Sequence, residues 1–293
     1  MSAADLYAHL GTGATTVARA WAVVRADGRV FGFTDHDRDL SFEGALFKAS
    51  SGMTASALLQ TTGLGIDNAE AVGALSDASV TEADILAGRF DGASVRVWQV
   101  NWADVGARVL QFNGTLGQIT RGAGAFHAEL RGLTEQINSA QGRVYQTNCG
   151  AVLGDGRCRF DLTQPGYFAE MAVVRVEAAR VFGFTGFAGF DDRWFERGRL
   201  VVLSGAAAGL AGVVKNDRLS DAGRAVELWQ ALGAAVAPGD LVRIEAGCDR
   251  LAASCRLKFH NLLNFRGFPD IPGEDWLTSY PTSAGVNDGG SLP

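Results

Sequence analysis

Short apolar runs alternate with glycine-containing turns through the first 145 residues of the chain. The run 20–25, the turn Asp27–Gly28 and the run 29–34 form a strong hairpin signal. Asn113–Gly114 predicts a second hairpin between the short runs on either side of it. Residues 1–145 are therefore predicted to form one or more β-rich domains. The remaining apolar runs predict strands at 40–49, 58–66, 94–102 and 125–131.

Three short helices are expected among these strands. Ser2 and Asp5 have the spacing of a capping box, which predicts a helix over residues 3–10. Thr81 and Gly88 bound a second short helix with acidic residues in its first turn. A third helix is predicted over residues 134–140.

The second half of the chain is predicted to form a C-terminal region over residues 146–277. This region encloses a small β domain at about 165–246, and residues 278–293 have too little apolar content to pack, so we expect a flexible tail. The fold class is mainly β with a few short helices. The strands expected in the inserted domain are 171–180, 199–203, 212–219 and 225–230.

Composition narrows the choice of function. The chain has 293 residues, of which 47% are hydrophobic and 20% charged, as in ordinary globular proteins. A net charge of −6 argues against a general nucleic-acid binder. The longest apolar stretch, 200–214, is too short to span a membrane. It predicts a strand, a turn and another strand. The N-terminus lacks the features of a secretory signal, so we expect synthesis in a reducing cytoplasm.

Four cysteines form two pairs, Cys149 with Cys158 and Cys248 with Cys255. Disulfides are rare in a reducing compartment, and zinc knuckles usually have tighter spacings than these. An iron–sulfur cluster also takes four thiolates, although neither spacing matches a ferredoxin run. Four unrelated buried thiols are the remaining alternative. The spacing leaves zinc and iron–sulfur open.

The sequence around each pair indicates how the thiols are presented. The glycines and Asp155–Gly156 between Cys149 and Cys158 predict a loop that doubles back. Apolar positions from 251 to 263 fit one face of an amphipathic helix. Seven helical residues rise roughly 10 Å. Cys248 is therefore expected just before this helix, and a cluster suits the span better than one zinc ion.

Other polar and aromatic groups have weaker signals. His36, between Asp35 and Asp37, could do acid–base work, but a polar turn that caps backbone groups is the favoured interpretation. His260 is a less favoured replacement for a thiolate, and His9 and His127 are taken as structural. The aromatic loop Phe182–Phe195 is interpreted as a core plug, with a glycan or partner surface as the alternative.

Several stretches together resemble a family of phage and prophage proteins that occur in tail clusters, including those of gene transfer agents, where the protein is the baseplate hub. The resemblance extends from about residue 15 to residue 277. The cysteine region is also similar to the tail-tip protein L of lambdoid siphophages, which carries an iron–sulfur cluster. The stretches are Phe33–Asp37, Asp84–Gly88, Val100–Trp102, Ala128–Gly132 and, most specifically, His260–Pro269.

This resemblance implies a structural tail-baseplate protein, not an enzyme. It implies tail-tube-like β-barrels that assemble into a homotrimeric ring. The ring is expected to join a distal tail protein ring to tail-tip or fibre proteins. It is also expected to surround a channel through which DNA passes without specific binding. It also implies a [4Fe–4S] cluster on Cys149, Cys158, Cys248 and Cys255, with zinc as the alternative. A cytosolic iron–sulfur or zinc enzyme and a glycan-binding tail module are the competing functions.

Overall fold

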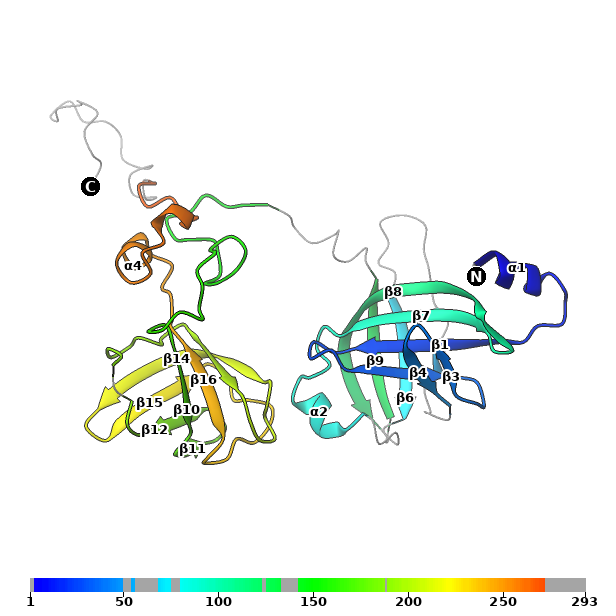
Figure 1. Cartoon of the computed structure of the whole chain (residues 1–293), viewed down its shortest axis with the longest axis horizontal. Coiled ribbons are helices and arrows are strands. Elements are labelled where there is room, and N and C mark those ends of the chain that lie inside the picture. Colours follow the sequence, from blue (N-terminus) through cyan, green and yellow to red (C-terminus); the bar gives the residue numbers. More distant parts are fainter. Residues whose placement is uncertain are drawn as a thin grey trace, which may run out of the picture. The chain divides into compact units, whose positions relative to one another are not determined.

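The computed structural model of the chain describes residues 3–49, 54–55, 68–74, 80–122, 125–132, 142–187 and 189–271. It divides into two compact units, Met1–Ala140 and Gln141–Pro293, each built on its own β-sheet (Figure 1). The mainly β fold class is thereby confirmed. The predicted strand 58–66, the helix 134–140 and the tail 278–293 lie outside the described residues.

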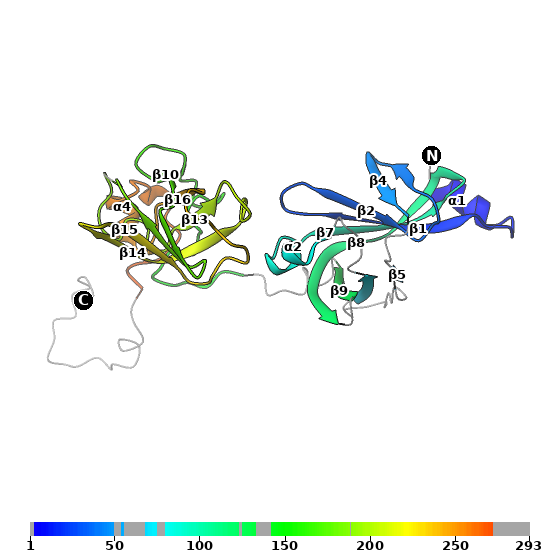
Figure 2. The ribbon, with the colours of Figure 1, turned by 90° about the horizontal axis from the view of Figure 1, so that it is seen from below.

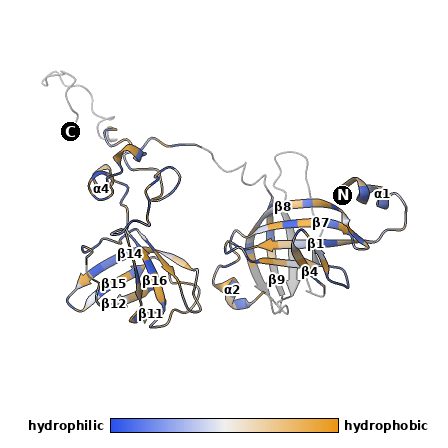
Figure 3. Ribbon diagram, in the orientation of Figure 1, coloured by the Kyte–Doolittle hydropathy of each residue, from blue (hydrophilic) through white to orange (hydrophobic). Residues whose placement is uncertain are grey.

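The first unit contains a nine-stranded sheet in the order β3-β4-β2-β1-β7-β8-β9-β6-β5. All neighbouring strands are antiparallel except β2 and β4, which are parallel. Apolar and polar residues alternate along β7 and β8 (Figure 3), and β8 curves along its length (Figure 2). The elements are α1 (Ala3–Leu10), β1 (Val17–Val24), β2 (Val30–Thr34), β3 (Leu40–Phe42), β4 (Ala45–Lys48), β5 (Thr54–Ala55), β6 (Asn68–Ala74), α2 (Glu82–Leu86), β7 (Ser94–Asn101), β8 (Asp104–Gly122) and β9 (Ala125–Gly132).

Strand β1 contributes side chains to apolar clusters on both faces of this sheet. Its odd-numbered residues Trp21 and Val23 contribute to one apolar cluster, and its alanines Ala20 and Ala22 to another. Alternate side chains of a strand point to opposite faces, so one strand serves both clusters. The alanines share their cluster with the aromatic rings of Phe42, Phe47 and Trp98.

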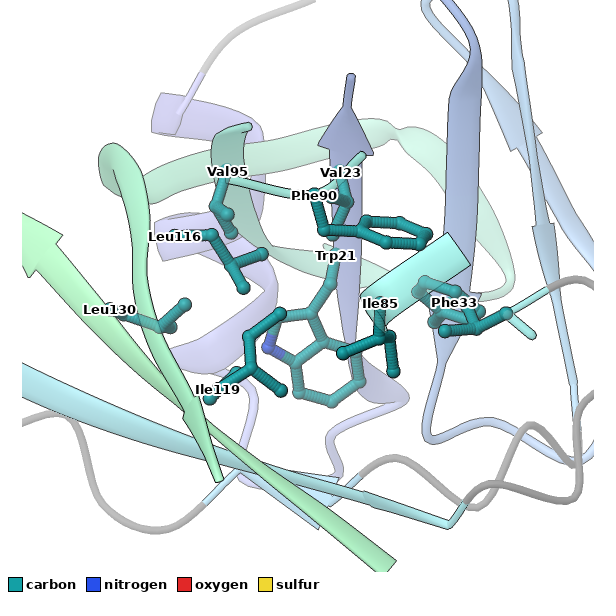
Figure 4. A pocket seen from close by; sticks show the side chains of 11 residues that line it. Trp21, Val23, Phe33, Ile85, Phe90, Val95, Leu116, Ile119 and Leu130 are labelled. Carbon is teal, nitrogen blue, oxygen red and sulfur yellow. The ribbon is translucent and has the colours of Figure 1, made fainter. Parts of the chain in front are cut away.

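The first cluster lines a cavity of about 30 Å³ (Figure 4). Ile85 of α2 closes it against Trp21 of β1 and Leu116 of β8. The space is sufficient for a water molecule, but a buried water needs two to four polar partners and the lining side chains are apolar. The cavity is therefore an apolar space beside the core cluster and not a polar site.

Several local predictions are confirmed in this unit. The helices at 3–10 and after Thr81 form, and Thr81 Oγ1 accepts a hydrogen bond from Asp84 N–H as an N-cap. The first hairpin turns at Asp27–Gly28, where Gly28 has a φ of +84°. The expected strand 40–49 is instead the hairpin β3–β4, because Glu43 and Gly44 both adopt positive φ and reverse the chain.

The predicted hairpin at Asn113–Gly114 is wrong. Both residues lie inside β8, and the chain turns earlier, at residues 102–103 between β7 and β8. A Cβ atom at Gly114 would lie 2.1 Å from the carbonyl oxygen of Arg131 in β9. Glycine is required here by the close approach of two strands rather than by a turn.

The second unit contains a seven-stranded sheet in the order β10-β16-β13-β14-β15-β12-β11. Its two end strands are consecutive in the sequence. Val173 N–H bonds to Asp240 O beside β16, and Val174 N–H bonds to Gly183 O in β12, so the chain passes directly from one end of the sheet to the other. The sheet thus closes into a small barrel without a long free edge. Its strands are β10 (Phe168–Ala172), β11 (Arg175–Glu177), β12 (Val181–Phe184), β13 (Arg199–Val202), β14 (Ala211–Ser220), β15 (Gly223–Leu228) and β16 (Leu241–Glu245).

Two predictions for this unit need correction. The expected strand 171–180 is divided between β10 and β11, and it ends at Ala178 and Ala179, which have positive φ. The expected helix from 251 to 263 is only α4 (Ala252–Leu257), followed by the 3-10 turn η1 (Leu262–Asn264). The chain leaves the helix before His260, whose φ of +48° is incompatible with a continuing helix.

The aromatic loop is part of the barrel core, as the core-plug interpretation predicts. Phe182, Phe184, Phe187 and Phe195 are buried in one cluster. The guanidinium of Arg224 lies over the rings of Phe187 and Phe195 and is paired with the buried carboxylate of Asp217. These rings are not available as a glycan platform.

Candidate metal centre

The four cysteines come together at one end of the second unit. Cys149 and Cys158 bound a loop that precedes β10, Cys248 follows β16, and Cys255 lies in α4. All four line one cavity of about 20 Å³, and all four thiols are free. The sequence prediction that Cys248 lies just before the helix is confirmed. The remaining lining residues are Ala151, Leu153, Arg250, Leu251, Phe259, Asn261, Asn264 and Phe265.

Backbone hydrogen bonds join the two cysteine segments. Cys149 N–H donates to Arg250 O at 2.8 Å, and Gly150 N–H donates to Arg266 O at 3.2 Å. The first loop doubles back around Asp155, whose carboxylate accepts from the N–H groups of Cys158, Val152 and Arg157. These bonds, from Cys158 first, hold the pKa of Asp155 below its usual range.

Three of the four sulfur atoms have a nitrogen donor within reach. Arg250 N–H lies 3.4 Å from Cys248 Sγ, and Arg266 N–H lies 3.4 Å from Cys149 Sγ. The side-chain amide of Asn261 lies 3.5 Å from Cys158 Sγ and donates to Cys158 O at 2.7 Å. Donors of this kind favour the thiolate form and tune metal–sulfur centres.

Burial has the opposite effect on the thiols, because it favours their protonated form and raises their pKa. Burial, followed by the proximity of the other three cysteines, raises the pKa of Cys255 to about 11. Burial also raises the pKa of Cys248. To lose their protons together, the four thiols would need a positive charge among them, which a bound metal would supply.

A lysine and an aromatic cluster connect the cysteine segments to the barrel. Lys258 Nζ donates to Trp194 O at 2.6 Å and to Gly247 O at 2.9 Å, and it lies 4.2 Å from the centre of the Trp194 ring. Its burial lowers the pKa of Lys258 to about 8. Phe160 and Phe259 pack edge to face beside the cysteines, with ring centres 5.0 Å apart. The segments that line the cavity are thus held against the barrel by hydrogen bonds of Lys258 and by aromatic packing.

Four thiols on one cavity form the donor set that either a zinc ion or an iron–sulfur cluster takes. Four thiolates on one zinc ion lie about 3.8 Å apart, from Zn–S bonds of about 2.3 Å in tetrahedral geometry. Within the described residues, no three His, Cys, Asp or Glu side chains are arranged to hold one metal ion. In a [4Fe–4S] cluster each thiolate binds a different iron atom, which separates the sulfur atoms further. His260 is exposed and does not line the cavity.

Two residues in this site have roles that the sequence interpretation did not assign. Asn261 bridges the segments, because its backbone N–H donates to Cys255 O at 2.9 Å while its side chain contacts Cys158. Asn264 fixes the side-chain orientation of Asn261 through a 2.7 Å hydrogen bond to its Oδ1 atom. In the sequence, these roles could have been suspected from the position of the two asparagines shortly after Cys255.

The turn around His36 is structural. Asp35 Oδ1 accepts from Arg19 N–H at 2.6 Å, and Asp39 Oδ1 accepts from Ala49 N–H at 2.8 Å. His36 Nδ1 accepts from Arg38 N–H, and the imidazole packs on the ring of Trp102. The predicted capping role is confirmed. His9 is also structural, since its Nε2 accepts from Thr16 N–H at 2.9 Å.

A curled sheet, a small barrel and a thiol-lined cavity define a mainly β protein with one cysteine site in the described residues. Besides the cysteines, the polar side chains that line the cavity are those of Arg250, Asn261 and Asn264, which do not form an acid–base pair. In the described part of the chain, the helices are too short or too polar to cross a membrane.

Comparison with known proteins establishes the family. The model described as "Baseplate hub protein, N-terminal attachment domain" matches residues 3–161, and the model described as "Phage conserved hypothetical protein BR0599" matches residues 193–275. A chain in the solved structure titled "Virion of native gene transfer agent (GTA) particle" is 63% identical, with a TM-score of 0.91 over 98% of this chain and 99% of that chain. No curated protein matches. This chain belongs to the baseplate hub protein family, which confirms the resemblance and the baseplate location expected from the sequence.

Proposed function

We propose that this chain is a baseplate hub whose C-terminal region is held together by a [4Fe–4S] cluster on Cys149, Cys158, Cys248 and Cys255. The observation that supports the cluster is the convergence of all four free thiols on one small cavity, from segments about ninety residues apart in the sequence. Bound there, the cluster would supply four iron–thiolate bonds that cross-link the two segments.

The surroundings of the cavity support a structural role for these bonds. Arg250 and Arg266 offer backbone donors to two sulfur atoms, and Asn261 offers its side-chain amide to a third. Leu153 and Phe259 cover other parts of the cavity with apolar groups. Hydrogen bonds stabilise the charged thiolates, and apolar cover limits access by water and oxidants.

The proposed assembly is a homotrimeric ring between the distal tail protein ring and the tail-tip or fibre proteins. The similar chain from the gene transfer agent virion supports a place in an assembled particle. Closed threefold symmetry requires a heterologous interface between neighbouring copies. A channel that passes DNA without binding it should have a polar or acidic wall, with which the net charge of −6 is compatible.

Metal analysis of the protein purified without oxygen tests the cofactor. We expect about four irons and four sulfides per chain, and an absorption band near roughly 400 nm that dithionite bleaches, as for thiolate-bound iron–sulfur clusters. A Cys158→Ser variant should lose most of the iron. One zinc per chain without iron would refute the cluster and leave the hub role standing.

A reconstruction of the tail tip tests the assembly separately. Three copies around the axis, with density joining the four cysteines within each copy, are expected. Location of the chain in the capsid or on a peripheral fibre would refute the hub arrangement.

A further inference from the structure

A groove of about 530 Å³ lies beside the cysteine site, on the surface of the second unit. Its walls are two segments distant in the sequence, 142–146 and 265–268. Phe268 N–H donates to Gln146 O at 2.9 Å and joins these segments. A Cβ atom at Gly267 would lie 2.6 Å from Thr147 O, so glycine allows the segments to approach closely at the base of the groove.

The groove is positively charged in a protein whose net charge is negative. Arg143, Arg157 and Arg266 line it, and the residues that line it include no aspartate or glutamate. Within the described part of the chain, none of these three guanidinium groups forms an ion pair, although the Asp155 carboxylate is close enough to Arg157 for their charges to interact. Arginines of the barrel such as Arg180 and Arg199 are instead paired with glutamates. The groove therefore offers three guanidinium groups that are not held in ion pairs among the described residues, and guanidinium groups bind carboxylates well.

The same groove offers apolar contacts and free backbone groups. Tyr145 is 75% exposed and Phe268 is 46% exposed, with ring centres 4.8 Å apart. Among the described residues, the backbone N–H groups of 143–148 have no acceptor. An extended peptide can pair with such a segment through its main chain while its alternate side chains contact the rings and the arginines.

We propose that this groove binds an extended acidic segment of a neighbouring tail protein, with carboxylates on Arg143, Arg157 and Arg266 and an apolar side chain on the Tyr145–Phe268 pair. Charge complementarity selects this partner, because a basic or neutral segment would leave three guanidinium groups without counter-charges. The proposal rests on the hub role and does not require the cluster.

Photo-crosslinking in assembled particles tests it. The photoreactive residue p-benzoylphenylalanine is placed at Tyr145 and, as a matched control, at the exposed aromatic Trp229 of the barrel. Irradiation followed by peptide sequencing should join position 145 to a segment of another tail protein that is rich in aspartate and glutamate. Position 229 should not give this product.

Charge reversal tests the chemistry of the contact. Arg143→Glu with Arg266→Glu should reduce the yield of that product roughly tenfold or more, because each removes a charge-assisted hydrogen bond. Arg175→Glu, at a 65% exposed arginine on the barrel, should not change it. Thermal unfolding of the purified variants shows whether each is folded.

Each other outcome overturns the inference. A crosslink to residues 272–293 of the same chain, to nucleic acid or to a segment without acidic residues would contradict the stated partner, as would a yield unaffected by the arginines. The absence of a crosslink in particles that contain the chain would also contradict it. Particles that assemble without the chain would instead refute the hub role.

Discussion

Replacement of Arg224 by methionine should destabilise the second unit strongly. The side chain is 1% exposed, and its Nε and Nη2 atoms lie 2.6 Å and 2.9 Å from the carboxylate oxygens of Asp217, which is 0% exposed. The variant keeps a side chain of similar length, but the buried Asp217 carboxylate then has a single donor among the described residues, Phe195 N–H at 2.9 Å. Removal of one partner from a buried ion pair costs about 3–5 kcal/mol.

The double variant Asp217→Leu with Arg224→Met distinguishes charge from packing. It removes both buried charges, so we expect it to recover part of the loss. Unlike the single variant, it also removes the acceptor of Phe195 N–H, and a buried unsatisfied donor costs about 1–3 kcal/mol. The double variant should therefore be more stable than Arg224→Met and less stable than the natural chain.

Native-state hydrogen exchange measures these changes within the second unit. The slowest amides of β14 and β15, the strands that carry the pair, should report the full loss in the free energy of unfolding. Arg199→Met is the control, since its guanidinium is 59% exposed and its pair with Glu245 should contribute about 1 kcal/mol or less. A loss below about 1 kcal/mol for Arg224→Met would refute the buried-pair argument.

Three further predictions concern other regions. Cys255→Ser should make the cysteine segments sensitive to protease while β10–β16 and the first unit stay protected; equal resistance to the natural chain would refute a clamp. Hydrogen bonds from Asn216 and Lys215 lower the pKa of Glu227, so its contribution to stability is present above about pH 4.5 and lost as the pH falls through the lowered pKa. Urea titrations at pH 3 to 6 should show that the free energy of unfolding of Glu227→Gln falls less steeply with decreasing pH than that of the natural chain. The same pH dependence in both proteins would contradict this. His36→Ala should fold and assemble; particles of normal composition without gene transfer or infectivity would point to an active role.

Local signals in the sequence predicted much of the fold. The predictions were wrong where contacts between distant segments determine the backbone conformation. The turn at Asp27–Gly28 and the helix after Thr81 form as predicted, because their backbone geometry depends on adjacent residues. Asn113–Gly114 has the same local signal as Asp27–Gly28. Glycine is nevertheless needed at position 114 because the backbone of Arg131 in β9 approaches it closely. The helix expected beyond residue 258 ends early at a positive φ that its apolar periodicity does not encode.

The cysteine pairs were recognised from their number and spacing, but their convergence is a property of the barrel. Spacing alone places Cys158 and Cys248 about ninety residues apart. Which strands pair, and therefore which loops emerge together, depends on long-range register that a single sequence does not specify. The bridging amide of Asn261 was missed for the same reason, since its partner is Cys158, 103 positions away.

The barrel also limits how much a bound cluster can stabilise the chain. β10 pairs with β16 so that Phe168 lies opposite Glu245, and the cysteine segments begin at this point on both strands. The loop of about ninety residues is thus already closed by strand pairing before the thiols meet. The cluster then orders only the short segments outside the barrel, and loop-closure entropy rises slowly with loop length, so its stabilisation should be local. For this reason we expect the loss of Cys255 to expose the cysteine segments and leave the barrel intact. Unfolding of the whole second unit in that variant would show instead that the barrel depends on the cluster for its own closure.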